Sequence, residues 1–109
     1  SPDSAANPYL TLAVCLAAGL DGIERNLTLP AEITENIFDM TPATRKRRGI
    51  EALPGSLDEA LVLMKKDKLI MSTLGEHVAC QFIAGKEREW EEYRTRVSSW
   101  ELDKYMINY

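Results

Sequence analysis

Apolar side chains recur every three or four residues through most of the chain, which is the period of a helix with one face against a core. No stretch shows the alternation of apolar and polar residues that a half-buried strand requires. The pattern predicts an all-α fold of about five to six helices, forming one segment over residues 1–109. We expect these helices at residues 8–25, 41–48, 56–66 and 68–74, from residue 76 onward, and at 98–109.

Capping signals mark the starts of these helices. Asn7-Pro8 and Thr41-Pro42 each combine a side chain that can accept hydrogen bonds from the free N–H groups of the first turn with a proline, which has no N–H of its own. Ser56 and Ser98 each stand three residues before a glutamate, which is the spacing of a capping box. The boundaries of the helices are therefore predicted largely by local chemistry.

A loop and two glycines are expected to separate the helices. Residues 26–39 lack helical periodicity and are interrupted by Pro30, so we expect a long loop across the surface. Gly49 and Gly75 are expected to end the helices that precede them. Large apolar residues of the loop are predicted to anchor it: Leu29, Ile33, Ile37 and Phe38.

The first expected helix is apolar on nearly every face between Tyr9 and Leu20. A helix with that pattern is normally buried all round. A chain of 109 residues can bury only roughly two-thirds of the surface it exposes when unfolded, so it can hardly enclose such a helix. Either the protein oligomerises tightly around it, or the chain is part of a larger protein that supplies the missing cover. The second interpretation is favoured.

Charge and composition exclude several classes of partner. Thirteen Lys and Arg stand against seventeen Asp and Glu, and the net charge of −4 favours neither nucleic acid nor an anionic membrane as a partner. The apolar run at residues 9–20 is shorter than the roughly 18–20 residues that span a bilayer, and we identify no targeting segment. The basic run at residues 45–48 is interpreted as a solvated or subunit-pairing surface.

Few residues of the chain could perform chemistry. His77 is the only histidine, and Cys80, one helical turn later, is the nearest candidate for a second ligand or a nucleophile, but nothing completes a metal site or a catalytic relay. Cys15 and Cys80 lie in apolar surroundings, so we expect buried, inert thiols in a reducing cytoplasm. The acidic run at residues 87–92 is interpreted as a solvated helix face. We therefore predict no catalytic, metal or cofactor site within this chain.

Several motifs resemble type I glutamine synthetases, over essentially the whole chain and most closely the branch found in Gram-positive bacteria. The segments that carry the resemblance are Ser1-Pro2-Asp3-Ser4-Ala5-Ala6-Asn7-Pro8-Tyr9-Leu10, Ala17-Ala18-Gly19-Leu20-Asp21-Gly22-Ile23, Asn36-Ile37-Phe38-Asp39-Met40, Leu53-Pro54-Gly55-Ser56-Leu57-Asp58-Glu59-Ala60-Leu61, Leu74-Gly75-Glu76-His77, Glu89-Trp90-Glu91-Glu92-Tyr93 and Trp100-Glu101. The resemblance implies that the chain is the C-terminal helical portion of the catalytic domain of a longer, cytoplasmic polypeptide. It also implies that the first helix packs against a catalytic sheet outside these residues.

The resemblance also implies the reaction of the parent protein. Enzymes of this family join glutamate and ammonia with ATP and Mg²⁺ or Mn²⁺, through γ-glutamyl phosphate. Their metal-binding and phosphate-binding residues would precede Ser1, so the chain alone is expected to be inactive. Its expected roles are packing, oligomer assembly and feedback regulation, and its partners would be the remainder of the domain and the other subunits of a dodecamer.

Individual residues acquire roles through the same resemblance. Phe38 stands where the enterobacterial branch has a tyrosine that is adenylylated, and it lacks the hydroxyl group that this modification needs. Glu89 matches a glutamate associated with feedback inhibition by glutamine. The C-terminal helix is expected to anchor the facing ring of the dodecamer through Trp100, Leu102, Tyr105, Met106 and Ile107. C-terminal surfaces of the branch also imply a nitrogen-regulatory transcription factor as a partner.

Two alternatives remain open at the level of sequence. The chain could be an autonomous helical module that binds a protein partner, because nothing in it forms a self-contained active site. It could also belong to a related γ-glutamyl-polyamine ligase, since those enzymes share the Asn7-Pro8-Tyr9 segment. In either case the uncovered first helix predicts that the isolated chain self-associates.

Overall fold

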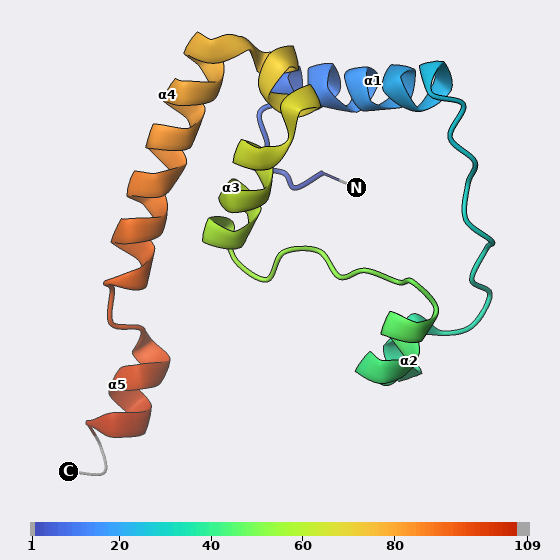
Figure 1. The fold of residues 1–109 in the computed structure, drawn as a ribbon. Coiled ribbons are helices and arrows are strands. Elements are labelled where there is room, and N and C mark those ends of the chain that lie inside the picture. Colours follow the sequence, from blue (N-terminus) through green and yellow to red (C-terminus); the bar gives the residue numbers. More distant parts are fainter. Residues whose placement is uncertain (1, 107–109) are drawn as a thin grey trace. The chain divides into compact units, whose positions relative to one another are not determined.

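The computed structural model describes residues 2–106, and every regular element in that range is helical. The chain divides into two compact units, Ser1–Gly55 and Ser56–Tyr109. The elements of the first unit are α1 (Pro8–Glu24), the short 3₁₀ helix η1 (Ile37–Asp39) and α2 (Pro42–Arg47); those of the second are α3 (Leu57–Lys66), α4 (Lys68–Arg94) and α5 (Ser99–Tyr105) (Figure 1). The predicted all-α class is confirmed for the described residues.

The predicted caps form the starts of α1 and α2. The Asn7 Oδ1 accepts hydrogen bonds from the N–H groups of Tyr9 and Leu10, at 3.0 and 3.3 Å. The Thr41 Oγ1 accepts from the N–H of Thr44 at 3.2 Å. Each interaction satisfies an amide that has no partner inside its helix, so the position of each start is set by local hydrogen bonds.

Helix α1 has no buried residue. Its large apolar side chains, spaced three or four residues apart, are mostly open to solvent: Tyr9 is 83% exposed, Leu12 70%, Leu16 65%, Leu20 51% and Ile23 73%. The expectation that the chain cannot enclose this helix is confirmed. None of the described helices, α1 included, is long and apolar enough to cross a membrane.

The segment after α1 differs from its prediction in two ways. Residues 37–39 form η1, in which the Asn36 side chain accepts from the Phe38 N–H at 3.2 Å. The predicted anchors do not act as such, because Leu29 is 93% exposed and Phe38 97% exposed, with Ile33 and Ile37 nearly two-fifths exposed. The prediction was wrong for Leu29 and Phe38, because an anchor needs a surface to pack against and the described residues supply none to these two side chains.

The end of α2 is a Schellman motif centred on Gly49. Gly49 has a φ of +70°, where a side chain would be strained. Its N–H donates to the carbonyl of Lys46 at 3.1 Å, and the N–H of Ile50 donates to that of Arg45 at 3.0 Å. The chain therefore turns back at Gly49, as predicted.

Helices α3 and α4 pack together and form the core of the second unit. Ser56 caps α3 through the N–H of Glu59, at 3.2 Å, and Asp67 caps α4 through the N–H groups of Leu69 and Ile70. Leu61 of α3 is 3% exposed and Ala79 of α4 is 0% exposed; these are the buried apolar residues of the described chain. The predicted inner face of α3 is confirmed: Leu57, Ala60, Leu61 and Met64 are its covered residues.

Gly75 interrupts α4 as expected. Its φ of +75° and ψ of 157° are not helical, and Figure 1 shows the bend that results. This region of conformational space is accessible essentially only to glycine. One residue thus separates the predicted short helix at 68–74 from the long helix that follows.

The C-terminal part of the long helix is shorter than the apolar pattern suggested. Helix α4 ends at Arg94, so Val97, which was assigned to its apolar face, lies in the connection to α5 and is 68% exposed. Helix α5 begins with the predicted Ser98–Glu101 capping box. Its predicted end near Tyr109 lies outside the described residues.

Both cysteine thiols are exposed, so the prediction of buried thiols was wrong. Cys15 lies on α1, which nothing in the described chain encloses, and Cys80 follows the buried Ala79 but lies on the outer face of α4. Apolar neighbours in sequence bury a residue only if another element covers that face.

Replacement of Gly75 tests whether its backbone conformation determines the fold of the second unit. We expect Gly75→Ala to lower the free energy of unfolding by about 1–3 kcal/mol, because the alanine must adopt a strained conformation. Gly85→Ala is the matched control: Gly85 is helical with open space around it, so the free energy of unfolding should rise by about 1 kcal/mol. Urea unfolding followed by circular dichroism measures both, and equal effects of the two substitutions would contradict the assignment.

Candidate functional site

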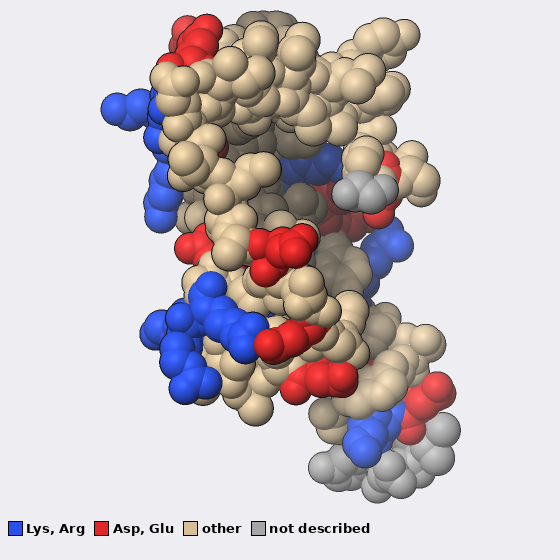
Figure 2. All heavy atoms as spheres, turned by 90° about the vertical axis from the view of Figure 1, so that its right-hand side faces the viewer, with Lys and Arg blue, Asp and Glu red and all other residues tan. Residues whose placement is uncertain are grey.

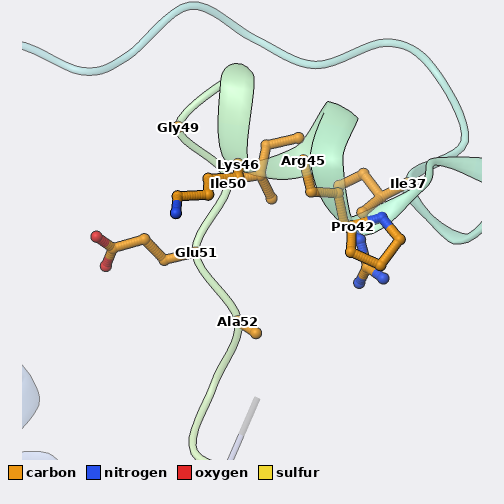
Figure 3. Close-up of a pocket in the computed structure, with 8 residues that line it drawn as sticks. All are labelled: Ile37, Pro42, Arg45, Lys46, Gly49, Ile50, Glu51 and Ala52. Carbon is orange, nitrogen blue, oxygen red and sulfur yellow. The ribbon is translucent and has the colours of Figure 1, made fainter.

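The first unit has a surface pocket beside α2 that the sequence did not indicate. It is an open hollow of about 520 Å³, and its lining residues are Ile37, Pro42, Arg45, Lys46, Gly49, Ile50, Glu51 and Ala52 (Figure 3). The reversal at Gly49 carries Ile50 back against α2, which forms one wall. The sequence signal that could have located it is the Gly49-Ile50 pair, because a Schellman motif places the residue after its glycine against the preceding helix.

Glu89, the predicted regulatory residue, lies on the exposed face of α4. Its carboxylate is 60% exposed and accepts a hydrogen bond from the Lys86 Nζ, at 2.6 Å between Nζ and Oε2. Exposed pairs of this kind contribute only about 0–1 kcal/mol, so the lysine can be exchanged for another cation at little cost.

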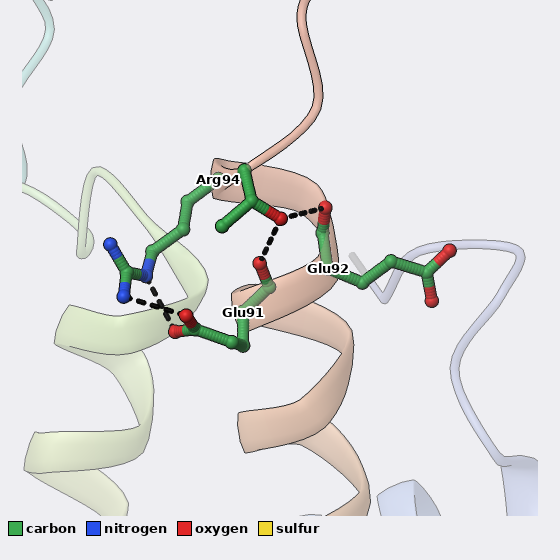
Figure 4. A network of polar contacts seen from close by, with 4 residues as sticks. Glu91, Glu92 and Arg94 are labelled. Atoms are coloured by element: carbon green, nitrogen blue, oxygen red, sulfur yellow. Dashed lines mark hydrogen bonds and ion pairs between the residues drawn. The ribbon is translucent and has the colours of Figure 1, made fainter.

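The remaining acidic residues near the end of α4 are held by neighbouring cations. Arg94 forms a fork with the Glu91 carboxylate, with distances of 2.6 Å from Nε to Oε2 and 2.7 Å from Nη2 to Oε1 (Figure 4). The hydrogen bonds and the charge of Glu91 raise the pKa of Arg94 above its usual value. Glu92 pairs with Arg96, and Glu87 pairs with Lys65 of α3. The interpretation of this run as a solvated helix face is confirmed, and the structure adds that its carboxylates are ion-paired.

Helix α5 presents the predicted anchor residues to solvent. Trp100 is 62% exposed, Leu102 43%, Tyr105 56% and Met106 70%; Ile107 lies outside the described residues. The rings of Trp100 and Tyr105 meet edge to face, with centroids 6.1 Å apart. The capping box fixes the start of the helix. The backbone N–H of Ser98, which has the larger effect, and the Ser98 hydroxyl both donate to the Glu101 carboxylate and lower its pKa. These residues therefore form an exposed aromatic and aliphatic surface on a short, well-capped helix.

The described residues do not fit a metal centre. No group of three His, Cys, Asp or Glu side chains within residues 2–106 lies close enough to hold a metal ion. His77 is exposed on α4, and one turn before it Thr73 donates its hydroxyl to the Leu69 carbonyl at 2.8 Å. Metal chemistry therefore has no ligand set in this part of the chain.

Comparison with known proteins identifies the class of protein. Residues 1–105 match the family described as "Glutamine synthetase, catalytic domain". Over 108 residues the chain is 51% identical to a glutamine synthetase of Clostridium saccharobutylicum and 50% identical to one of Thermus thermophilus; over 109 residues it is 47% identical to one of Staphylococcus aureus. The alignments include 99%, 99% and 100% of this chain, but 24% of each relative.

The chain belongs to the glutamine synthetase catalytic-domain family and corresponds to the C-terminal part of that domain. It spans about a quarter of the length of the curated relatives it matches, at 24%. The predicted family is therefore confirmed, and the exposed apolar surface of α1 is what a separated part of a larger domain should have.

Proposed function

We propose that the chain is part of an enzyme that makes glutamine from glutamate, ammonia and ATP through γ-glutamyl phosphate. The observation that carries this proposal is the match of nearly the entire chain, at about half identity, to proteins named glutamine synthetase. Those names favour ammonia over a polyamine as the acceptor. The reaction belongs to nitrogen assimilation in the cytoplasm.

The reactive groups are assigned to the rest of the polypeptide. ATP and Mg²⁺ or Mn²⁺ would bind residues outside this chain, because the described residues contain no group of side chains suited to a metal ion. The isolated chain is accordingly inactive in this proposal. Its own contributions are packing against the rest of the catalytic domain, assembly of the oligomer and feedback regulation.

The exposed side of α1 supports the packing role. Its five large apolar side chains, each at least half exposed, share a helical spacing and would be covered by the remainder of the domain. Burial of one such side chain contributes about 1.5–3 kcal/mol relative to full exposure, so the stripe as a whole would contribute substantially to folding of the complete domain. A module that binds a partner could also expose such a surface, so it is the match of the chain to glutamine synthetases that favours the enzyme over that alternative.

Activity measurements on two polypeptides test the proposed function. The 109-residue chain should produce no γ-glutamyl phosphate or glutamine from glutamate, ammonia, ATP and Mg²⁺, whereas the complete polypeptide should turn over. Turnover by the chain alone would contradict the placement of the reactive groups. A complete polypeptide that accepts a polyamine and rejects ammonia would contradict the assigned acceptor.

Glu89 is proposed to transmit feedback inhibition by glutamine through an arginine of the active site. Its side chain is 60% exposed and held by a single contact to the half-buried Lys86, so its carboxylate is available to a second cation. A partner arginine would belong to the part of the polypeptide outside this chain. The C-terminal surface is also proposed as the place where a nitrogen-regulatory transcription factor binds.

In the complete enzyme, Glu89→Gln should raise the glutamine concentration for half-inhibition by about tenfold or more, the effect of losing one charge-assisted hydrogen bond. The kcat should change by less than about twofold, since the residue touches no substrate in this proposal. Glu92→Gln is the control, because it removes the same charge and one exposed ion pair from the same helix. Inhibition that responds equally to both variants would remove the regulatory assignment.

The exposed residues of α5, together with Ile107, are proposed to anchor the facing ring of a two-ring dodecamer. Trp100 and Tyr105 already contact each other and so present a pre-arranged aromatic pair. Aromatic side chains that become buried at an interface commonly contribute much of its binding energy.

Trp100→Ala should shift dissociation of the complete enzyme into smaller species to concentrations at least tenfold higher, corresponding to about 1.4 kcal/mol or more per anchor. Tyr93→Ala is the control, since Tyr93 is a 71% exposed aromatic residue outside the anchor. Mass photometry across a dilution series measures both. An unchanged distribution for Trp100→Ala at nanomolar concentration would contradict the anchor.

A further inference from the structure

Three consecutive cations of α2 have no acidic partner among the described residues. Arg48 pairs with Glu35 at 2.9 Å, but Arg45, Lys46 and Arg47 form no ion pair within residues 2–106. By contrast, the acidic side chains at positions 87, 89, 91 and 92 of α4 are each paired with a cation. Figure 2 shows a group of Lys and Arg side chains on the face that carries α2, with acidic side chains beside it.

The position of these cations at the end of α2 offsets only part of the free-energy cost of placing three positive charges together. They occupy the last turn of α2, where the helix dipole favours positive charge by about 0.3–1 kcal/mol each. The same dipole cannot cancel the mutual repulsion of adjacent charges on so short a helix. Their full charge therefore remains available to an external anion.

Two of the cations also line the pocket described above. Figure 3 shows Arg45 beside Pro42 and Ile37, and Lys46 on the side of Glu51. Between them the pocket walls are largely apolar, and the volume of about 520 Å³ falls in the range of known binding pockets, roughly 300–1,000 Å³. We call Ile37, Pro42, Arg45, Lys46, Arg47 and Ile50 the α2 surface.

We propose that the α2 surface docks an acidic segment of a partner protein, with an apolar side chain in the pocket and flanking carboxylates on Arg45, Lys46 and Arg47. The positive charges of α2 attract the carboxylates of the segment, and the apolar walls of the pocket favour an apolar side chain between those carboxylates. This interaction needs no catalytic group and is distinct in sequence from the C-terminal anchor and from Glu89. It adds a binding function to those proposed above.

Nucleic acid fits the α2 surface less well than an acidic peptide. Binding to nucleic acid strengthens with the number of phosphates neutralised, and the three cations of α2 that form no ion pair within residues 2–106 neutralise few, in a chain of net charge −4. Glu51 at the pocket would also repel a continuous polyanion. A peptide can place its carboxylates beside the cations alone and leave an apolar residue facing the pocket.

Fluorescence anisotropy with the complete polypeptide tests the proposal. The probe is a labelled peptide with Phe-Leu at its centre and glutamates on both sides; its two variants carry Gly-Gly at the centre or lysines in place of the glutamates. The first peptide should bind most tightly, and its binding should weaken as salt is added. Arg45→Gln/Lys46→Gln/Arg47→Gln should weaken binding by about tenfold or more, and Ala52→Glu should weaken it by placing a carboxylate at the pocket.

A second triple variant separates local docking from net charge. Lys66→Gln/Lys68→Gln/Arg88→Gln removes the same charge from the second unit and should change the affinity by less than about twofold. Equal weakening by the two triple variants would overturn the proposal. So would tighter binding of a single-stranded oligonucleotide than of the Phe-Leu peptide, or the absence of any peptide binding to the complete polypeptide.

Discussion

The rest of this structure depends on one constraint, which is how much of the apolar surface of each helix another element can bury. In the described chain only the contact between α3 and α4 buries apolar residues, at Leu61 and Ala79. The first unit has no such pair, and α1 keeps its large side chains in solvent. The hydrophobic effect is the dominant driving force of folding, and the described residues bury little of the apolar surface through which it acts.

Local chemistry explains why the helices could nevertheless be predicted. The caps of Asn7, Thr41, Ser56 and Ser98, and the turn at Gly49, satisfy backbone groups within a few residues of themselves. These interactions do not depend on the rest of the domain. The boundaries that they set agree with the structure to within a few residues.

The inner face of α3 was predicted correctly because α4 covers it, but other predictions that required a second surface failed. Leu29 and Phe38 were expected to anchor a loop, and the two cysteines to be buried, but an apolar environment in sequence is not an apolar environment in space. Val97 continued the apolar spacing of α4 beyond the point where the helix ends. The pocket beside α2 escaped prediction for a related reason, since it is formed by a chain reversal that no periodicity encodes.

The residues of the candidate site likewise fall into those whose environment the sequence predicted and those whose environment only the structure shows. Periodicity and spacing placed Glu89 on a solvated helix face, and the structure agrees; its regulatory role was implied by family resemblance alone. The exposure of Trp100 and its neighbours became visible only in three dimensions. The structure of part of a domain therefore shows which residues are exposed. The role of each exposed residue depends on the group that contacts it in the complete protein.

Gly75 has a consequence for how variation in this family should be interpreted. A Cβ atom added at Gly75 would have open space around it. The backbone angles of Gly75, however, would be strained for any other residue type. Any other residue here would cost the fold about 1–3 kcal/mol, which by itself is a reason for the position to stay glycine. Conservation of glycine at this position among relatives would therefore reflect the backbone conformation, and it would carry no information about substrates or partners.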